Sequence, residues 1–272
     1  MTDRYAVFGN PIAHSKSPRI HTLFAMQTGQ DLSYEALLAP VDGFAAAVAA
    51  FAAGDGRGAN VTVPFKEEAF RLATQLTPRA QAAGAVNTLS FAVDQVIGGD
   101  NTDGAGLVHD LKFNLGCDVA GRRVLLLGAG GAARGAILPL LGEAPAELFI
   151  ANRTAAKAAR LALEFAHGGG VVPEGGGFDE LRGRRFDLVI NATAAGLAAA
   201  TLPLPPTIFA PHSFAYEMLY GRDTAFMAQA RAGGAAHVAD GLGMLVEQAA
   251  EAFYVWRQVR PETGPILAAL RP

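Results

Sequence analysis

The sequence contains one cysteine, one tryptophan and few charged residues, and these shortages exclude several classes of protein. A single cysteine, Cys117, cannot form a disulfide within the chain or build a cysteine-based zinc site. No apolar run reaches the roughly eighteen residues that a transmembrane helix needs, so no membrane span is expected. The net charge of −3 provides no broad positive field, so we expect no nucleic-acid partner.

Two further absences concern location and metal binding. Residues 1–5 lack the long apolar segment of a secretory signal peptide, so we expect a cytoplasmic protein. The six histidines show no spacing typical of metal ligands, so we expect no metal site. The sequence leaves the oligomeric state open, with a homodimer as one arrangement.

Hydrophobic residues make up 51% of the 272 positions, and alanine and glycine are abundant. This length allows two domains, and the composition is typical of an α/β protein rather than a disordered chain. Strand-like and helix-like patterns alternate, which predicts βαβ units and parallel sheets. Strands are expected at residues 5–8, 32–38, 58–63, 123–127, 147–151, 186–190, 214–218 and 235–238, with a hairpin at 86–93 and 96–98. Helices are expected at 17–28, 44–53, 65–73, 103–115, 243–259 and 265–270, and a surface loop at 168–177.

A glycine-rich turn in the middle of the chain is the most informative motif. The expected strand at 123–127 runs into Gly128-Ala129-Gly130-Gly131-Ala132-Ala133, and a helical pattern follows to residue 141. This is the G-x-G-x-x-A form of the dinucleotide fingerprint, between a strand and a helix as that motif requires. Gly128 would permit the tight turn, and Gly130 would let the backbone approach a pyrophosphate. A turn that serves packing alone is the alternative, but the flanking elements favour dinucleotide binding.

The end of the next strand, 147–151, indicates which dinucleotide binds. An NAD-binding unit usually carries Asp or Glu there to hold the ribose 2′-hydroxyl. Here Asn152-Arg153-Thr154 occupies that position, and Lys157 follows about one helical turn later. Because two cations suit a 2′-phosphate, the predicted cofactor is NADP(H).

Several polar residues of the first part of the chain are candidates for chemistry. Thr62 and Lys66 lie around a strand end and a helix start, where a lysine could take the hydroxyl proton during alcohol oxidation. An exposed lysine on a solvated helix is the alternative. Asp103 could orient that lysine or simply cap a helix. Ser15 and Ser17, the latter also expected to cap a helix, form a candidate carboxylate site.

Two amide residues are weaker candidates on pattern alone. Asn87 and Thr88 follow Gly84-Ala85-Val86 and could mark a polar strand edge. Gln248 lies on the expected long helix and could face solvent.

With these residues in hand, the chain resembles the NADP-linked shikimate/quinate dehydrogenase family over almost its whole length. The matching segments occur in order at residues 8–18, 58–66, 84–88, 99–104, 128–133, 152–154, 191–193 and 240–244. The resemblance implies an α/β fold with an N-terminal α/β substrate domain, a Rossmann-type NADP-binding domain, and C-terminal helices that return to the first domain. We therefore expect residues 1–103 and 241–272 in the substrate domain and residues 104–240 in the NADP-binding domain.

The same resemblance implies the reversible NADPH-linked reduction of 3-dehydroshikimate to shikimate, a step of aromatic amino-acid biosynthesis. It implies Lys66 and Asp103 as the catalytic pair, with Lys66 as the acid–base. Substrate contacts are implied for Ser15, Ser17, Thr62, Asn87, Asp103, Tyr220 and Gln248. Cofactor contacts are implied for Gly128, Ala129, Gly130, Gly131, Ala132, Asn152, Arg153, Thr154, Lys157, Met218 and Gly241.

The chain also departs from the family pattern, and the pattern leaves rivals open. Pro78 stands where many relatives carry Glu, Ala194-Ala195 replaces Ser-Ser, and Glu217 replaces Asp. The nearest rival is a quinate/shikimate dehydrogenase of broader specificity. Others are a non-catalytic ligand-binding relative, which intact Lys66 and Asp103 disfavour, and a methyltransferase, which Arg153 disfavours. A turnover assay separates these readings.

Overall fold

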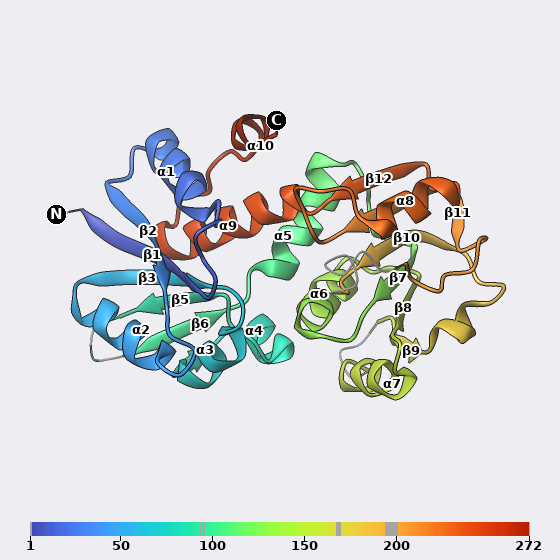
Figure 1. Ribbon diagram of the computed structural model, residues 1–272, viewed down its shortest axis with the longest axis horizontal. Coiled ribbons are helices and arrows are strands. Elements are labelled where there is room, and N and C mark those ends of the chain that lie inside the picture. Colours follow the sequence, from blue (N-terminus) through green and yellow to red (C-terminus); the bar gives the residue numbers. More distant parts are fainter. Residues whose placement is uncertain (1, 93, 95, 167–169, 194–200, 272) are drawn as a thin grey trace. The chain divides into compact units, whose positions relative to one another are not determined.

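The computed structural model describes residues 2–92, 94, 96–166, 170–193 and 201–271. The chain divides into two compact units, one formed by Met1–Gly106 with Leu245–Pro272 and the other by Leu107–Met244. Each unit has its own six-stranded sheet (Figure 1). Every helix in the described part of the chain is too short or too polar to span a lipid bilayer.

The first unit has a mixed sheet in the order β2-β1-β3-β5-β6-β4. β1 pairs in parallel with β2 and β3, whereas β5 runs antiparallel to both β3 and β6. Its strands are β1 (Asp3–Gly9), β2 (Leu32–Leu38), β3 (Gly56–Val61), β4 (Gln75–Leu76), β5 (Thr88–Phe91) and β6 (Ile97–Asp100). Its helices are α1 (Ser17–Thr28), α2 (Phe44–Ala53), α3 (Lys66–Leu72), α4 (Pro78–Ala83) and α10 (Gly264–Leu270), and α5 (Asp103–His109) and α9 (Leu242–Arg257) continue into the second unit.

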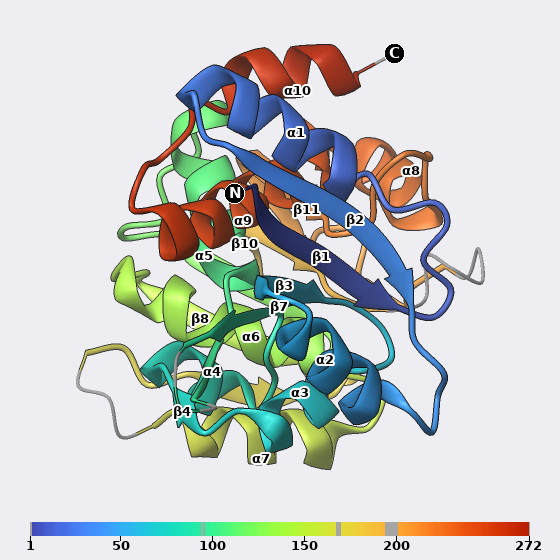
Figure 2. The same cartoon turned by 90° about the vertical axis from the view of Figure 1, so that its left-hand side faces the viewer.

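Alternation along β1 gives the first sheet two buried faces. Ala6 and Phe8 pack with residues of α2 and α3, while Tyr5 and Val7 belong to a cluster that includes Trp256 of α9. Successive side chains of a strand point to opposite faces, so one strand serves both layers. Figure 2 shows the result, with α1 and α9 on one side of the sheet and α2 and α3 on the other.

The second unit is a parallel sheet in the order β12-β11-β10-β7-β8-β9. Its strands are β7 (Arg123–Leu127), β8 (Glu147–Ala151), β9 (Glu174–Gly176), β10 (Phe186–Asn191), β11 (Phe209–Glu217) and β12 (His237–Asp240). Its helices are α6 (Gly131–Gly142), α7 (Ala155–Glu164) and α8 (Ala225–Ala232), with a π-helical turn at Asp110–Asn114 and a 3₁₀ turn at Phe178–Leu181. This is the doubly wound order, whose strand order reverses between β7 and β10, where dinucleotides bind.

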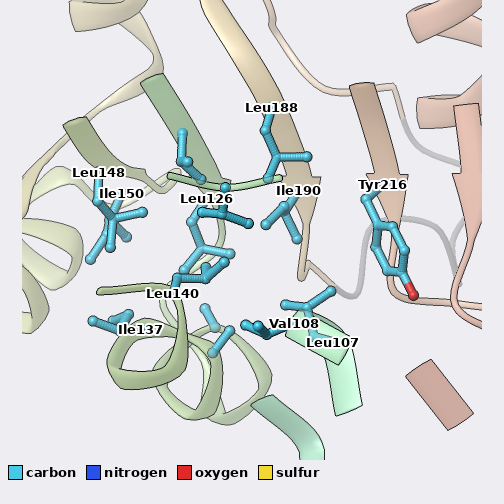
Figure 3. Packing of buried hydrophobic residues seen from close by; sticks show 14 of the residues in the cluster. Leu107, Val108, Leu126, Ile137, Leu140, Leu148, Ile150, Leu188, Ile190 and Tyr216 are labelled. Atoms are coloured by element: carbon cyan, nitrogen blue, oxygen red, sulfur yellow. The ribbon is translucent and has the colours of Figure 1, made fainter. Parts of the chain in front are cut away.

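The core under this sheet explains the length of its apolar runs. Leu126 of β7, Ile150 of β8 and Ile190 of β10 meet Ile137 and Leu140 of α6, all of them fully buried (Figure 3). Strands of a parallel sheet are covered on both faces, so their sequences read as continuous hydrophobic runs. The run Val124–Leu127 is of this kind, and each of its residues is buried.

The predicted α/β class is confirmed, and most expected elements are present within a few residues of their predicted ends. The hairpin expected at 86–93 and 96–98 is confirmed as the antiparallel pair β5–β6, which joins the first sheet by the antiparallel pairing of β5 with β3. The loop expected at 168–177 is partly wrong, because Glu174–Gly176 forms the edge strand β9. The short β4 and α4 were not predicted. Ala194-Ala195, one of the departures from the family pattern, lies outside the described residues.

The start of α1 also differs from expectation. Lys16 holds the cap position without a side-chain hydrogen bond, and Ser17 is already helical. Instead, the hydroxyl of Ser15 accepts a hydrogen bond from the backbone N–H of Ser17 at 3.3 Å. The hydroxyl of Ser17 is therefore not used as a helix cap.

Candidate functional site

The first unit brings Lys66 and Asp103 into direct contact. Lys66 is the first residue of α3 and Asp103 the first residue of α5. The Nζ of Lys66 donates to Oδ2 of Asp103 at 2.5 Å, with 30% and 18% of the two side chains exposed. The side chain of Asp103 is thus directed at the lysine, as one of the two sequence-based readings expects. A partly exposed amine held by a carboxylate is suited to exchange a proton with a bound molecule.

Asn87 joins this pair from the position just before β5. Its Nδ2 group donates to Oδ1 of Asp103 at 2.8 Å and to the hydroxyl of Thr102 at 3.0 Å. Its Oδ1 accepts from the backbone N–H of Thr102 at 2.9 Å. Because a backbone N–H can only donate, this bond fixes which end of the amide faces Asp103. Asn87 is 2% exposed, so it holds the second carboxylate oxygen of Asp103 without competition from water.

Gln248 reaches the same cluster from α9. Its Oε1 lies 3.3 Å from Nδ2 of Asn87, and its Nε2 donates to the carbonyl of Leu245 at 2.8 Å. The alternative of a solvent-facing glutamine is wrong, since the side chain turns toward Asn87. The close approach depends on Gly106 of α5, where an added Cβ would lie 2.5 Å from the backbone nitrogen of Gln248.

A buried polar chain extends from Asn87 toward Ser17. Asn60 donates to the carbonyl of Asn87 at 3.1 Å, and the phenol of Tyr34 donates to Oδ1 of Asn60 at 2.7 Å. Burial raises the pKa of Tyr34 well above its ordinary value, although a hydrogen bond with the side chain of Ser17 acts in the opposite direction. The structure therefore connects Ser17 to Asn87 through two residues that the sequence reasoning missed as site components. They lie on β2 and β3, which β1 separates in the sheet, and no sequence pattern records that proximity.

Thr62 and Ser15 lie beside this network rather than in it. Thr62 follows β3, where its N–H donates to the carbonyl of Phe8 at 2.9 Å and its carbonyl accepts from Phe65 at 3.0 Å. Its side chain is half-buried, and so is that of Ser15. No metal-binding group of three or more His, Cys, Asp or Glu residues occurs in the described part of the chain.

The glycine-rich turn of the second unit has the geometry that its sequence predicts. Gly128 has φ of +110°, and an added Cβ would lie 3.1 Å from the carbonyl oxygen of Ala192. A Cβ at Gly130 or Gly131 would meet no described atom within 4 Å. Packing thus requires glycine at Gly128, whereas glycine at the other two leaves a bare backbone cradle at the start of α6. Such a cradle fits a pyrophosphate, since free N–H groups point from a helix N-terminus.

The basic segment after β8 is open to solvent. Arg153, Thr154 and Lys157 are exposed, and Asn152 is half-buried and donates to the carbonyl of Thr154 at 3.1 Å. Neither Arg153 nor Lys157 forms an ion pair with any residue that the structure describes. Two cations at this strand end are available to an external phosphate.

Met218 and Gly241 lie next to each other at the ends of β11 and β12. A Cβ at Gly241 would lie 2.1 Å from the carbonyl oxygen of Met218, so only glycine fits there. Glu217, a departure from the family pattern, is buried and accepts from Asn191 and Thr224, both at 2.8 Å. Burial raises the pKa of Tyr220, which follows this segment.

Comparisons with known proteins cover both units. Residues 7–89 match a family model described as the shikimate dehydrogenase substrate binding domain. Residues 111–200 match a model described as shikimate / quinate 5-dehydrogenase, and residues 241–271 match the shikimate 5′-dehydrogenase C-terminal domain. A curated relative, the shikimate dehydrogenase (NADP(+)) of Dechloromonas aromatica (strain RCB), is 64% identical over 273 residues, which are 100% of this chain and 98% of the relative.

Two solved structures agree with these matches. The crystal structure of an Ael1 enzyme from Pseudomonas putida is 48% identical with a TM-score of 0.93, and the alignment covers 100% of this chain and 99% of that one. The structure of shikimate 5-dehydrogenase from Thermus thermophilus in complex with NADP(H) and shikimate is 34% identical with a TM-score of 0.85, and that alignment covers 98% of each chain.

Proposed function

Because the chain belongs to the shikimate dehydrogenase family, we propose that it is an NADP-dependent oxidoreductase that interconverts 3-dehydroshikimate and shikimate. The observation that carries this proposal is the hydrogen-bonded cluster of Lys66, Asp103 and Asn87 in the first unit. Reduction of a ring ketone to an alcohol needs a proton at the oxygen, and Lys66 has three donor hydrogens of which Asp103 occupies one.

In the direction of reduction, Lys66 gives a proton to the carbonyl oxygen as that oxygen becomes a hydroxyl. NADP(H), when bound, supplies or accepts the hydride at the same ring carbon. In the reverse direction the amine of Lys66 takes the hydroxyl proton. Asp103 holds the amine and, through its hydrogen bond to Asn87, is itself prevented from rotating away. Asp103 also contacts the substrate hydroxyls in this proposal.

The remaining polar residues of the first unit bind and orient the substrate. Ser15 and Ser17 hold its carboxylate with their hydroxyls, and the Ser17 hydroxyl is not used as a helix cap. Thr62, Asn87 and Gln248 bind ring hydroxyls, because a hydroxyl or an amide can both donate and accept hydrogen bonds. Tyr220 of the second unit contacts the carboxylate.

The second unit would hold NADP(H). The backbone of Gly128, Ala129, Gly130, Gly131 and Ala132 takes the pyrophosphate at the start of α6. Asn152, Arg153, Thr154 and Lys157 take the adenosine ribose and its 2′-phosphate, since a guanidinium recognises phosphate with two parallel hydrogen bonds. Met218 and Gly241 line the nicotinamide side.

The test is nicotinamide absorbance in four pairings of NADP or NAD with shikimate or quinate. We expect rapid reduction only with NADP and shikimate. Comparable turnover of quinate would instead identify a broader shikimate/quinate enzyme. Absence of turnover in all four pairings, with the folded state verified by circular dichroism, would contradict the proposed activity.

Location and assembly belong to the same proposal. We place the enzyme in the cytoplasm, where aromatic amino-acid biosynthesis would supply its substrate, and cell fractionation tests this. For assembly the choice lies between a monomer and a homodimer, which sedimentation equilibrium over micromolar chain concentrations distinguishes.

A further inference from the structure

A cluster of charged residues in the first unit joins the end of β6 to α9, the helix that carries Gln248. Arg79 of α4 donates from Nε and Nη2 to the two carboxylate oxygens of Asp100, at 2.6 and 2.5 Å. Its remaining Nη1 donates to Glu251 of α9 at 2.8 Å. One guanidinium thus binds the end of β6 and the middle of α9 together.

The cluster continues beyond Arg79 and is largely withdrawn from water. Arg260 donates to Glu251 at 2.6 Å and lies 3.5 Å from Glu247, whose side chain is fully buried. Only 8% of the Asp100 side chain and 26% of the Arg79 side chain are exposed. Burial alone would raise the pKa of Asp100, but the hydrogen bonds and charge of Arg79 outweigh it and lower that pKa. The carboxylate therefore stays charged and bound to Arg79.

Hydrogen bonds of Asp100 restrain the short segment that leads from β6 to Asp103. Its Oδ1 accepts from the backbone N–H of Asn101 at 2.7 Å and from the hydroxyl of Thr77 at 2.6 Å. Asn101 in turn accepts from the backbone N–H of Asp103 at 3.2 Å. A displacement of Asp100 would thus be passed along the loop to the carboxylate that holds Lys66.

Glu251 connects Arg79 to the other element, α9. It lies one helical turn after Gln248 on α9, and residues three apart share a helix face. Fixing Glu251 against Arg79 therefore fixes the rotation and depth of α9 where Gln248 approaches Asn87. One end of the Arg79 bridge, Asp100, is thus one short loop away from Asp103. The other end, Glu251, is one helical turn away from Gln248.

We propose that Arg79 is a positioning residue, which holds Asp103 and Gln248 in register by joining β6 to α9. The inference rests on the proposed function for its catalytic readout but on the contacts above for its geometry. Arg79 donates to the carboxylates of Asp100 and Glu251, neither of which is a candidate substrate contact. It acts only through Asp100 and Glu251.

The test compares Arg79→Met with Arg257→Met as a matched control. Arg257 lies in the same unit with a similarly small exposed fraction, 19%, and is bound by Asp3 and Gln30. Both variants lose stability, because each removes an ion pair from a partly buried carboxylate, although Asp3 retains Arg57 and Glu251 retains Arg260. Only Arg79→Met is expected to lower kcat and to raise the KM for shikimate. The expected effect is about 10- to 100-fold in kcat/KM, since small misplacements of reacting groups cost up to about 10²-fold. The KM for NADP should be unchanged.

A second readout does not depend on activity. Hydrogen–deuterium exchange of the Arg79→Met protein should increase in peptides covering residues 100–106 and 244–251, whereas the Arg257→Met protein should show wild-type exchange there. If Arg79→Met fails to fold, Arg79→Lys takes its place, because it retains one charge but cannot bind both carboxylates. Wild-type exchange in those peptides together with wild-type kcat and KM would overturn the proposal. Absence of turnover in the wild-type protein would contradict the proposed function alone and leave the exchange experiment decisive.

Discussion

At the scale of single residues, the candidate chemistry depends on which partners hold each polar group. Asp103 receives Lys66 on one oxygen and Asn87 on the other, so its carboxylate cannot rotate without breaking a bond. Asn87 is held by the backbone of Thr102, so the orientation passes from main chain to amide to carboxylate to amine. The amine of Lys66 is therefore held in one place, as the proposed proton transfer requires.

We expect Lys66→Ala to lower kcat by about 10²–10⁴-fold, the usual contribution of a positioned acid–base group. The KM for shikimate should change less, because other residues hold the ring. Asp103→Ala should affect both kcat and KM. The double variant should cost far less than the product of the two single effects, since residues that act as a unit are not additive.

The matched control for this prediction is Lys112→Ala. Lys112 has nearly the same exposed fraction, 31% against 30%, and pairs with Glu143 at 2.6 Å in the second unit. Its variant should retain wild-type kinetics. Near wild-type kcat in a folded Lys66→Ala protein across the pH range would contradict the assignment of Lys66.

A second residue-scale prediction concerns stability and pH. His21 is fully buried and stacks on Tyr34 with ring centroids 4.1 Å apart, and burial lowers its pKa from 6.5 to about 3. The unfolded chain therefore binds a proton below pH 6.5 that the folded chain does not bind. Protonation of His21 in the unfolded chain therefore favours unfolding at low pH. The free energy of unfolding is highest above pH 6.5 and falls as the pH falls toward 3. Between pH 7 and pH 5 this residue alone should lower the free energy of unfolding by about 2 kcal/mol.

Urea unfolding followed by the fluorescence of Trp256 measures this decrease in the free energy of unfolding. Trp256 is the sole tryptophan and lies beside His21, so its fluorescence reports on the first unit. His21→Phe retains an aromatic ring without a titrating group. The wild-type protein should lose about 2 kcal/mol more than the variant between pH 7 and pH 5. Equal losses in the two proteins would show that His21 does not titrate as described.

At the scale of elements, the strand–turn–helix unit β7–α6 separates two uses of glycine. Gly128 is needed by the fold, since its positive φ and the nearby carbonyl of Ala192 exclude a side chain. Gly130 has ordinary extended backbone angles and open space around it. The fold therefore requires glycine at position 128. At position 130 glycine is required only if a ligand approaches the backbone.

We expect Gly128→Ala to destabilise the protein by about 1–3 kcal/mol, the usual cost of a strained backbone conformation. Gly130→Ala should leave the melting temperature close to that of the wild type but raise the KM for NADP, because its methyl group would occupy the pyrophosphate cradle. Thermal unfolding and NADP titration of both variants check this. Unchanged NADP affinity in Gly130→Ala would show that the pyrophosphate does not bind at this turn.

At the scale of the whole molecule, the proposed function assigns its two ligands largely to different units. All but one of the proposed substrate contacts lie in the first unit, and all proposed cofactor contacts lie in the second. Variants should therefore affect one ligand at a time.

We expect Ser15→Ala to weaken shikimate binding and leave the KM for NADP unchanged. Arg153→Ala should raise the KM for NADP and leave that for NAD nearly unchanged, because NAD lacks the 2′-phosphate. The double variant should show the sum of the two free-energy changes, since the residues share no partner. Steady-state kinetics with each ligand varied separately gives these values. Equal loss for NADP and NAD in Arg153→Ala would show that the basic segment does not read the phosphate.

The sequence by itself determined the α/β class, the glycine-rich turn between a strand and a helix, and the order of most elements, because these follow from local patterns. Buried parallel strands are continuous apolar runs, and the turn residues of a fingerprint are adjacent in the chain. It also indicated Lys66 and Asp103 as candidates, although spacing alone left each with a plain alternative.

Only the tertiary structure decided which polar residues meet. The contacts of Lys66 with Asp103 and of Asn87 with Gln248 join positions far apart in the sequence. No periodic pattern records a pairing between α3, α5, α9 and the residue before β5. The pairing of the hairpin with β3 and the bridge of Arg79 to Asp100 and Glu251 were not predicted, for the same reason. Local propensity decides whether a segment forms a helix or a strand. The partners of a side chain are decided by packing between segments that are far apart in the sequence.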